Sequence, residues 1–522
     1  MKRKLLKTLN PEMKNSRILG ILLLLSAAFM AVLAAVNPGV VDAFNIYWMA
    51  AGAAVVTGGL LAAERKEAAI YFARIVTGAV FLVSGLIKVN DTVGFAIKLE
   101  EYFDENALGA FWANFHDWAL PISFFVSGIE VLLGLALIFG ARVRLASYAL
   151  LGMTLFFGWL TYYTAECNEA QMSAIAAGTD FNRVCVTDCG CFGDALRGSV
   201  GRSLTPWESF YKDLGLFFMV VVLVWGAGRI KVNSGRDNLI ILPAALVITL
   251  LFGGWLFGWF LPSAFLLVSF VFFVLLKQLK IKGTTFEWGL AILLAVLTYG
   301  FASYTYSHLP VKDYRPYAVG KNIKDQMKSA EELGLEPTVY ATVYKLENEE
   351  TGETKTVNSK EYLEKEIWKD KSWKIVHSSD EPIVISRGYE PPIASFNVMN
   401  EEGVDIGDEL LNDPNYSLMA VMYDMEKTNT GLPLKDFKTL AASAVANGHH
   451  VYAVTSSPYE VYEPFRHTHD LQIPVYEADE IFLKTIVRAN PGLLLLKDGE
   501  IIMKWHGNDI PTYNVMAQKY ME

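Results

Sequence analysis

Long apolar runs recur along the first 310 residues of this chain and limit what it can fold into. A helix needs about 20 apolar residues to cross the ~30 Å hydrocarbon core of a bilayer. Nine runs approach or reach this length. They lie at about 18–37, 45–63, 69–88, 119–140, 144–165, 210–228, 239–260, 262–277 and 284–306. The sequence therefore predicts an α-helical polytopic membrane domain over residues 1–310, in which the seventh and eighth runs form two crossings or a re-entrant pair.

Charge separates the two parts of the chain. Residues 1–310 contain 23 Lys and Arg against 20 Asp and Glu, whereas residues 311–522 contain 22 against 35. Binding to nucleic acid needs clustered Lys and Arg that face the phosphates. The acidic second part therefore excludes nucleic acid from the predicted partners, and membrane lipid is the expected partner of the first part.

Basic residues in the short connections predict the orientation, because Lys and Arg gather in cytoplasmic loops. They occur before the first run and then in every second connection, at 65–66, 142–144, 229–236 and 277–282. We therefore expect a bacterial inner-membrane protein with a cytoplasmic N-terminus, whose nine crossings place residues 311–522 in the periplasm. The first run lacks a clear small-residue cleavage site, so we interpret it as a retained helix rather than a signal peptide.

All four cysteines fall in one predicted extracytoplasmic loop, residues 166–209. They are Cys167, Cys185, Cys189 and Cys191. A disulfide between Cys189 and Cys191 would close a small ring, whose strain favours exchange over permanent cross-linking, and Gly190 supplies the backbone freedom it needs. We predict redox-active thiols. Structural disulfides and a metal site are the alternatives, but Cys-x3-Cys-x-Cys lacks the paired Cys-x2-Cys spacing of zinc sites, so we assign no metal ligands.

Charged residues in the predicted spans are functional candidates, because burying a charge in a bilayer is costly. Glu130 lies about halfway along its helix and needs a partner or a role in proton transfer. Four further candidates are expected close to the outer surface: Lys88, Asp91, Lys212 and Asp213. The structural alternative is that Arg74 extends towards the inner headgroups, and that Lys212 and Asp213 cap a solvated helix end.

A quinone is the one cofactor that these residues suggest. A quinone pocket near the outer face would need such polar groups beside aromatic rings. Trp207, Phe210 and Tyr211 lie close to Lys212 in the sequence. The predicted cofactor-binding residues are Glu130, Lys88, Asp91, Trp207, Lys212 and Asp213.

Several of these motifs resemble a known family. They are Arg74-Ile-Val-Thr-Gly78 with Ser84-Gly85-Leu-Ile-Lys88-Val-Asn-Asp91, then Gly128-Ile-Glu130, Cys189-Gly-Cys191-Phe-Gly-Asp194 and Trp207-Glu-Ser-Phe-Tyr-Lys212-Asp213. Over about residues 65–230 they resemble the DoxX and MauE-like membrane proteins, whose unit is a four-helix bundle. The resemblance implies redox work at the membrane face. MauE-like members are associated with maturation of periplasmic enzymes that need disulfides, and DoxX and DoxD relatives with quinone-linked oxidoreductases.

The remaining residues predict an α/β soluble region. Residues 311–390 would form a linker and a small subdomain with a hairpin at 338–358. From 391 onwards, strands are expected at 417–423, 449–455, 474–477, 493–496 and 501–503, and helices at 434–447 and 458–468. This order, with Asn490-Pro491 before the last hairpin, resembles the thioredoxin-like fold, in which that proline is cis. The segment Tyr423-Asp-Met-Glu-Lys427 holds no cysteine where the family has its thiols, so the resemblance implies a docking platform.

Two hypotheses follow. The first is thiol-disulfide or quinone-linked electron transfer in support of a periplasmic client or redox partner, in which Cys189 and Cys191 exchange electrons while Cys167 and Cys185 pair or relay. The second is a non-catalytic assembly or receptor protein with structural disulfides in the loop. A transporter is disfavoured, because the spans hold few charges and no evident inverted repeat.

Overall fold

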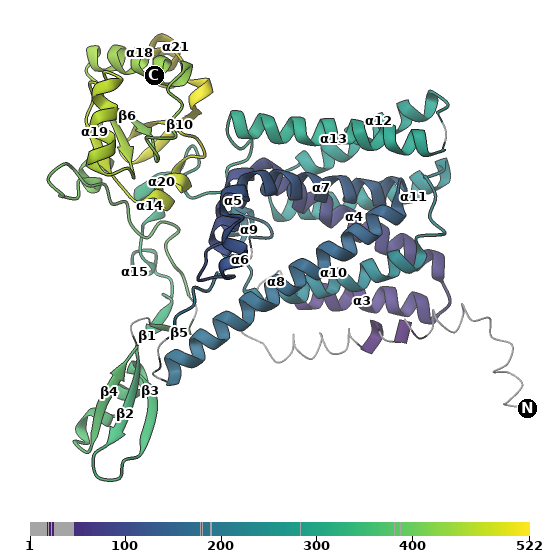
Figure 1. The fold of residues 1–522 in the computed structure, drawn as a ribbon, viewed down its shortest axis with the longest axis horizontal. Helices are drawn as coiled ribbons and strands as arrows, with labels where there is room; N and C mark the ends of the chain where they lie inside the picture. Colours follow the sequence, from purple (N-terminus) through teal and green to yellow (C-terminus); the bar gives the residue numbers. More distant parts are fainter. Residues whose placement is uncertain are drawn as a thin grey trace, which may run out of the picture. The chain divides into compact units, whose positions relative to one another are not determined.

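The structure is a computed structural model. It describes residues 18, 20–21, 23–25, 46–177, 179, 181–187, 190–281, 283–379, 382–386 and 388–521. Two compact units divide the chain, one formed by Met1–Glu169 with Arg183–Ala302 and the other by Ala170–Asn182 with Ser303–Glu522. Among the described residues, all strands belong to the second unit (Figure 1).

Seven helices of the described chain are long and apolar enough to cross a membrane. They are α4 (Lys66–Asn90), α7 (Ala119–Phe139), α8 (Val143–Ala177), α10 (Pro206–Gly226), α11 (Gly235–Thr249) with its π-helical continuation η2 (Leu250–Leu256), α12 (Leu261–Gln278) and α13 (Gly283–Ser307). A shorter apolar helix, α3, covers Ile46–Ala62. These helices coincide with eight predicted runs, and most of the ninth, 18–37, lies outside the described residues.

The chain is therefore a helical membrane protein. Its helices expose large apolar side chains, among them Leu239, Trp255 and Val296, and these require lipid around them. The inner membrane and the orientation of the helices stay predictions.

Small residues let α4 and α7 approach closely. Gly78 and Gly85 lie about two turns apart on α4. A Cβ added to Gly134 of α7 would lie 2.7 Å from the carbonyl oxygen of Gly78, and one added to Gly85 would lie 2.8 Å from the backbone nitrogen of Val131. Membrane helices use small residues for such contacts. The glycines thus fix which side chains of α4 face α7.

The four helices of the expected bundle share one apolar core. It includes Ala73 and Phe81 of α4, Leu137 of α7, Leu150 of α8 and Val220 of α10. In the connection between α4 and α7 the chain forms α5 (Thr92–Tyr102), α6 (Ala110–Ala113) and η1 (His116–Trp118). These short helices were not predicted.

Two helix boundaries differ from the predicted ones and change the setting of candidate residues. α8 continues to Ala177, so Cys167 lies on a helix rather than in the loop. α10 begins at Pro206, because Thr205 accepts a hydrogen bond from the backbone of Glu208 while the Glu208 carboxylate accepts one from the backbone of Thr205. This capping box places Lys212 and Asp213 well inside the helix. A short helix, α9 (Asp194–Val200), precedes it.

The second unit contains a five-stranded sheet in the order β10-β9-β6-β7-β8. Its strands are β6 (Tyr416–Val421), β7 (His450–Thr455), β8 (Val475–Glu477), β9 (Gly492–Lys497) and β10 (Glu500–His506). β6, β7 and β8 run parallel, whereas β9 is antiparallel to both β6 and β10. All five agree with the predicted strands. The Asn490-Pro491 peptide before β9 is cis.

Alternate residues of the central strand β6 enter two separate cores. Leu418 and Ala420 pack with α18 (Leu432–Ala446), α19 (Tyr459–Thr468) and α21 (Tyr513–Tyr520), whereas Met419 and Val421 pack on the other face with α17 (Gly407–Leu411) and α20 (Glu480–Ile486). A strand covered on both faces is apolar throughout. The region is therefore a three-layered α/β arrangement, as Figure 1 shows.

Residues 311–390 contain more regular structure than a linker with one hairpin. The predicted hairpin is formed by β2 (Val343–Asn348) and β3 (Thr354–Asn358), and β4 (Trp373–Ser378) pairs with β2 on its other side. β1 (Val339–Ala341) pairs with β5 (Ile383–Ser386), and α14 (Ile323–Gln326), α15 (Ala330–Leu333), α16 (Ser359–Glu364) and η3 (Ile367–Lys369) complete this part. Near the start of this range, the chain contacts the larger sheet. There the backbone N–H of Gly320 donates to the carbonyl oxygen of Ile501.

Candidate functional site

A buried ion pair joins α4 to α7. The Nζ atom of Lys88 lies 2.5 Å from Oε1 of Glu130, and their side chains are only 6% and 2% exposed. The close approach at Gly85 places the two helices so that these side chains meet, since a Cβ at Gly85 would lie 3.0 Å from the Cβ of Glu130. The partner that Glu130 was expected to need is therefore Lys88, whose side chain is buried within the bundle.

Ser84 links this ion pair to the cysteine loop. Its hydroxyl lies 3.1 Å from Oε2 of Glu130 and 3.2 Å from the carbonyl oxygen of Cys191, and it can donate to either. The Lys88 ammonium group also lies over the rings of Phe95 and Phe157, at 5.2 and 5.7 Å from their centroids. These contacts help to keep a cation in the apolar interior.

A second ion pair comes from α10. Nζ of Lys212 lies 2.5 Å from Oδ1 of Asp213, with side-chain exposures of 13% and 5%. The second carboxylate oxygen of Asp213 lies 3.4 Å from the hydroxyl of Thr161 on α8. The interpretation of Lys212 and Asp213 as a solvated helix cap is therefore wrong.

The two ion pairs and Cys191 line one cavity of about 40 Å³. Phe192 lies beside Cys191 in its wall, and Thr154 of α8 closes another side. The loop reaches this place through a tight turn, in which Gly190 and Gly193 both have positive φ. A Cβ at Gly190 would lie 2.7 Å from the side chain of Lys98, so glycine is required there. Of the three cysteines that the structure describes, Cys191 is thus the one placed beside Lys88 and Glu130. Cys189 lies outside the described residues.

A disulfide between Cys167 and Cys185 ties the loop to α8. Near it, the side-chain amide of Asn168 donates to the carbonyl oxygen of Val186. Cys167 is buried, with 2% exposure. Cys167 and Cys185 were predicted either to pair or to relay electrons. In the structure they are paired.

The other candidate residues lie apart from the cavity lining. Asp91 caps α5, where its carboxylate accepts from the backbone of Gly94 at 2.8 Å. Trp207 stacks on Tyr211 with 6.0 Å between ring centroids. The cavity is also far smaller than ligand pockets, which start at roughly 300 Å³. The described residues therefore give the quinone prediction no support.

Arg74 is buried rather than extended towards headgroups. Its guanidinium group donates to the carbonyl oxygen of Leu137 near the end of α7 and, at 2.8 Å, to Oδ1 of Asn233. A cation is favourable at a helix C-terminus. Arg74 thus stabilises the end of α7.

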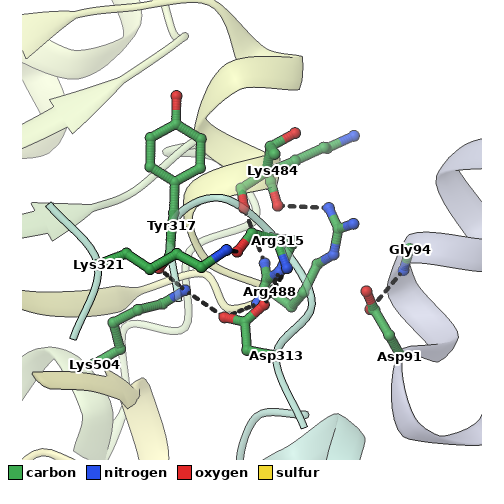
Figure 2. Close-up of polar contacts among 10 residues, drawn as sticks. Asp91, Gly94, Asp313, Arg315, Tyr317, Lys321, Lys484, Arg488 and Lys504 are labelled. Atoms are coloured by element: carbon green, nitrogen blue, oxygen red, sulfur yellow. Dashed lines mark hydrogen bonds and ion pairs between the residues drawn. The ribbon is translucent and has the colours of Figure 1, made fainter. Parts of the chain in front are cut away.

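A third group of charges lies in the second unit, where Asp313, Arg315 and Lys504 point towards one another (Figure 2). Oδ1 of Asp313 accepts from Nε of Arg315 at 2.7 Å, and Oδ2 accepts from Nη2 of Arg315 at 2.9 Å and from Nζ of Lys504 at 2.8 Å. Lys504 also donates to the carbonyl oxygen of Tyr317, and Arg315 to that of Thr485. No sequence pattern predicted this cluster, because Asp313 and Lys504 are 191 residues apart in the chain.

Burial decides the protonation of this cluster. The pKa of Lys504 is lowered to about 7, mainly by complete burial and also by the charge of Arg315, while Asp313 opposes both. Burial alone would raise the pKa of Asp313, but the charges of Arg315 and Lys504 and their hydrogen bonds bring it well below its usual range. Asp313 therefore stays ionised and holds two cations.

Polar groups occupy the loop where the thioredoxin-like resemblance would place thiols. The Thr428 hydroxyl donates to Oδ1 of Asn490, and the Asn490 amide donates to the carbonyl oxygen of Asp424 at 2.7 Å. These bonds join the end of β6 to the residue before the cis proline. The loop is therefore held in place by hydrogen bonds.

These features define a helical membrane protein with a buried, charged cavity beside a cysteine loop. In a comparison with protein families, the model of the methylamine utilisation protein MauE matches residues 66–168. The matched segment contains Ser84, Lys88, Glu130 and Cys167 and ends before Cys185 and Cys191. No curated protein and no solved structure matches the chain.

Proposed function

We propose that this membrane protein carries out thiol-disulfide exchange, with Cys189 and Cys191 as the exchanging pair and Cys167–Cys185 as a structural brace. The observation that carries the proposal is the position of Cys191, which lines the same cavity as the ion pair of Lys88 and Glu130. Thiol chemistry depends on the thiolate, which nearby cations stabilise. Two lysines line this cavity.

The exchange has a closed balance of electrons and protons. A dithiol of the client attacks the Cys189–Cys191 disulfide, passes through a mixed disulfide, and leaves as a client disulfide. One S–S bond breaks and one forms, and two electrons and two protons move to Cys189 and Cys191. A quinone remains the predicted acceptor that would reoxidise the pair, with Trp207 and the other residues predicted for it.

The second unit supports a client-binding role. The strand order β7-β6-β9-β10, with helices on both faces, is the arrangement expected of a thioredoxin-like domain, and no cysteine occurs in residues 311–522. We infer that this domain binds the client rather than reacting with it. With the N-terminus in the cytoplasm, the domain and the cysteine loop would both lie in the periplasm.

The family match suggests the kind of process. Its name refers to methylamine utilisation, and the resemblance implies maturation of periplasmic enzymes that need disulfides. We propose such an enzyme, or a redox partner of it, as the client.

A second candidate is a non-catalytic assembly or receptor protein. The observation that favours it is the hydrogen-bonded loop around Asn490, which replaces thiols in the client-binding domain. In this case Cys189 and Cys191 would form a second structural disulfide.

The test uses purified full-length protein in lipid nanodiscs and a reduced synthetic peptide with a Cys-x-x-Cys pair. After mixing, free thiols are alkylated and located by mass spectrometry. We expect Cys189 and Cys191 to become reduced as the peptide becomes oxidised, while Cys167–Cys185 stays intact. Cys191→Ser leaves Cys189 as a thiol and is mixed instead with the oxidised peptide. Cys189 should then attack the peptide disulfide and form a mixed disulfide with one peptide cysteine, while the other peptide cysteine is released as a thiol.

Cys167→Ser with Cys185→Ser is the matched control and should still exchange with the peptide. Resistance of all four cysteines to the peptide would contradict exchange and favour the assembly protein. Addition of a quinone analogue to the reduced protein tests the acceptor separately, because loss of the Cys189 and Cys191 thiols is expected only if a quinone reoxidises them.

A further inference from the structure

Charged side chains reach the cavity beside Cys191 from three helices, whereas α5 and α8 line it with Phe95, Thr154 and Phe157. α4 supplies Lys88, α7 supplies Glu130, and α10 supplies Lys212 and Asp213. On the loop side, Lys98 of α5 packs against Gly190, and Asp194 begins α9 three residues after Cys191. Within the cavity lining, two cations and two carboxylates are therefore balanced.

The balance of charge in a buried site determines whether a proton can leave it. An unpaired charge in a low-dielectric interior is costly. A Cys191 thiol that released its proton to bulk water would leave the cavity with one extra negative charge. Transfer of the same proton to a carboxylate inside the cavity keeps the total charge unchanged.

The contacts distinguish between the two carboxylates. Glu130 shares the Ser84 hydroxyl with the carbonyl oxygen of Cys191, at 3.1 and 3.2 Å. Asp213 instead directs its second oxygen to Thr161 of α8 at 3.4 Å. Glu130 is thus the carboxylate that is coupled to the Cys191 turn.

We propose that Glu130 accepts the proton of the Cys191 thiol, and that Lys88 then changes from the counter-ion of Glu130 to the counter-ion of the thiolate. The S–H bond breaks, an O–H bond forms on Glu130, and no charge leaves the cavity. The cavity of about 40 Å³ is lined by the four charged side chains and is large enough for a water molecule to carry the proton. This inference rests on the proposed exchange function, for which it supplies the proton acceptor, and Lys88 is a positioning residue.

The test measures how fast Cys191 is alkylated as a function of pH. The parent is full-length Cys189→Ser protein in nanodiscs with the Cys167–Cys185 disulfide intact, and iodoacetamide labelling of the Cys191 peptide is followed by mass spectrometry. An ordinary thiol reacts about tenfold faster for each pH unit below its pKa, because the thiolate is the reactive form. Since internal proton transfer does not depend on bulk pH, the parent is expected to react at a nearly constant rate between about pH 6 and 8.

Two variants should change this profile in different ways. Glu130→Gln removes the acceptor and leaves Lys88 to stabilise the thiolate, so the rate should rise about tenfold per pH unit and exceed that of the parent at the upper end. Lys88→Met removes the counter-ion and should slow alkylation by at least about tenfold. A purely structural loosening would accelerate both variants alike.

Matched controls separate the cavity from general effects. Glu287→Gln breaks the ion pair of Glu287 with Arg142, which does not line the cavity, and should leave the profile flat. Glu130→Asp keeps a carboxylate as the proton acceptor and leaves the charge of the cavity unchanged, so it should also keep the profile flat. If Lys88→Met does not yield folded protein, the contrast between Glu130→Gln and Glu130→Asp decides the assignment.

Three outcomes would overturn the inference: a tenfold rise per pH unit in the parent, a flat profile in Glu130→Gln, or the same steep profile in Glu130→Asp as in Glu130→Gln. Failure of the proposed function is distinguishable from these. If the Cys189→Ser parent has a flat profile but the protein with all four cysteines does not exchange with the peptide, the exchange function is contradicted. If that protein exchanges with the peptide but the parent has a steep profile, only the role of Glu130 is contradicted.

Discussion

The bundle and the C-terminal unit each bury charged side chains, but the two groups are built differently. Both oxygens of Asp313 are fully occupied by Arg315 and Lys504, which also bond to backbone carbonyl oxygens. Glu130 instead has one oxygen bonded to Lys88 and the other near a hydroxyl that it shares with Cys191, beside a cavity.

This difference separates a structural cluster from one that can react. A buried carboxylate whose hydrogen bonds are all made stabilises one arrangement and stays ionised. A buried pair with space and a shared hydrogen bond can exchange partners. The following predictions test this contrast, from the largest expected effect to the smallest.

Asp313→Asn should have the largest effect on stability. It leaves Arg315 and Lys504 buried without a counter-charge, and breaking a buried pair in this way costs about 3–5 kcal/mol. Hydrogen exchange of β10 in the full-length protein measures the loss. Lys504→Met is the matched variant and should cost far less, because Arg315 still pairs with Asp313; equal effects would show that the cluster is not organised around Asp313.

Removal of the disulfide should have the next largest effect. Cys167→Ser with Cys185→Ser opens a loop of 18 residues, for which about 3 kcal/mol is expected. The loss should appear as faster proteolysis of the segment around Val184 and Val186. Cys189→Ser with Cys191→Ser should leave the proteolysis rate unchanged, and a similar rate in both double variants would argue against the division into brace and exchanging pair.

Gly85→Ala tests whether helix packing positions the Lys88–Glu130 pair. The new Cβ would lie 2.7 Å from Val131 and 3.0 Å from the Cβ of Glu130, and overpacking of this kind costs about 1–3 kcal/mol. Thermal unfolding in nanodiscs measures it. Gly152→Ala on α8 meets no atom within 4 Å and should be neutral; a neutral Gly85→Ala would mean that α4 and α7 can separate without cost.

The smallest effect concerns pH. Lys504 has its pKa lowered to about 7 by burial, whereas an unfolded lysine titrates near 10.4, so above pH 7 the unfolded chain binds more protons. Well below pH 7, Lys504 is charged in the folded protein, and the full free-energy cost of burying that charge reduces stability. As pH rises, Lys504 loses its proton and this cost falls. The free energy of unfolding of the unit should therefore rise by about 1 kcal/mol between pH 7 and 8. Hydrogen exchange of β9 and β10 measures this gain. Lys504→Met should abolish it, and an unchanged slope would assign the titration to another group.

Periodicity predicted most of the fold, but its misses have identifiable causes. The apolar spans and the strands of the larger sheet were readable because each buries a long or continuous apolar stretch. β4 and β5 were missed because both strands are short and largely exposed. The signal for them was their β-branched residues, Ile375, Val376 and Ile383–Ile385. The capping box at Thr205 and Glu208 was a readable signal for the earlier start of α10.

The sequence by itself determined that the chain has apolar helices, that its cysteines gather in one segment, and that an α/β region without thiols follows. Only the tertiary structure decided that Lys88 pairs with Glu130, that Lys212 and Asp213 face the same cavity, and that Cys191 lies beside them. The physical reason is that hydrophobic patterning specifies which face of a helix is buried but not which helix will cover it. Close contacts at residues such as Gly85 make that choice, and they depend on the shape of both partners.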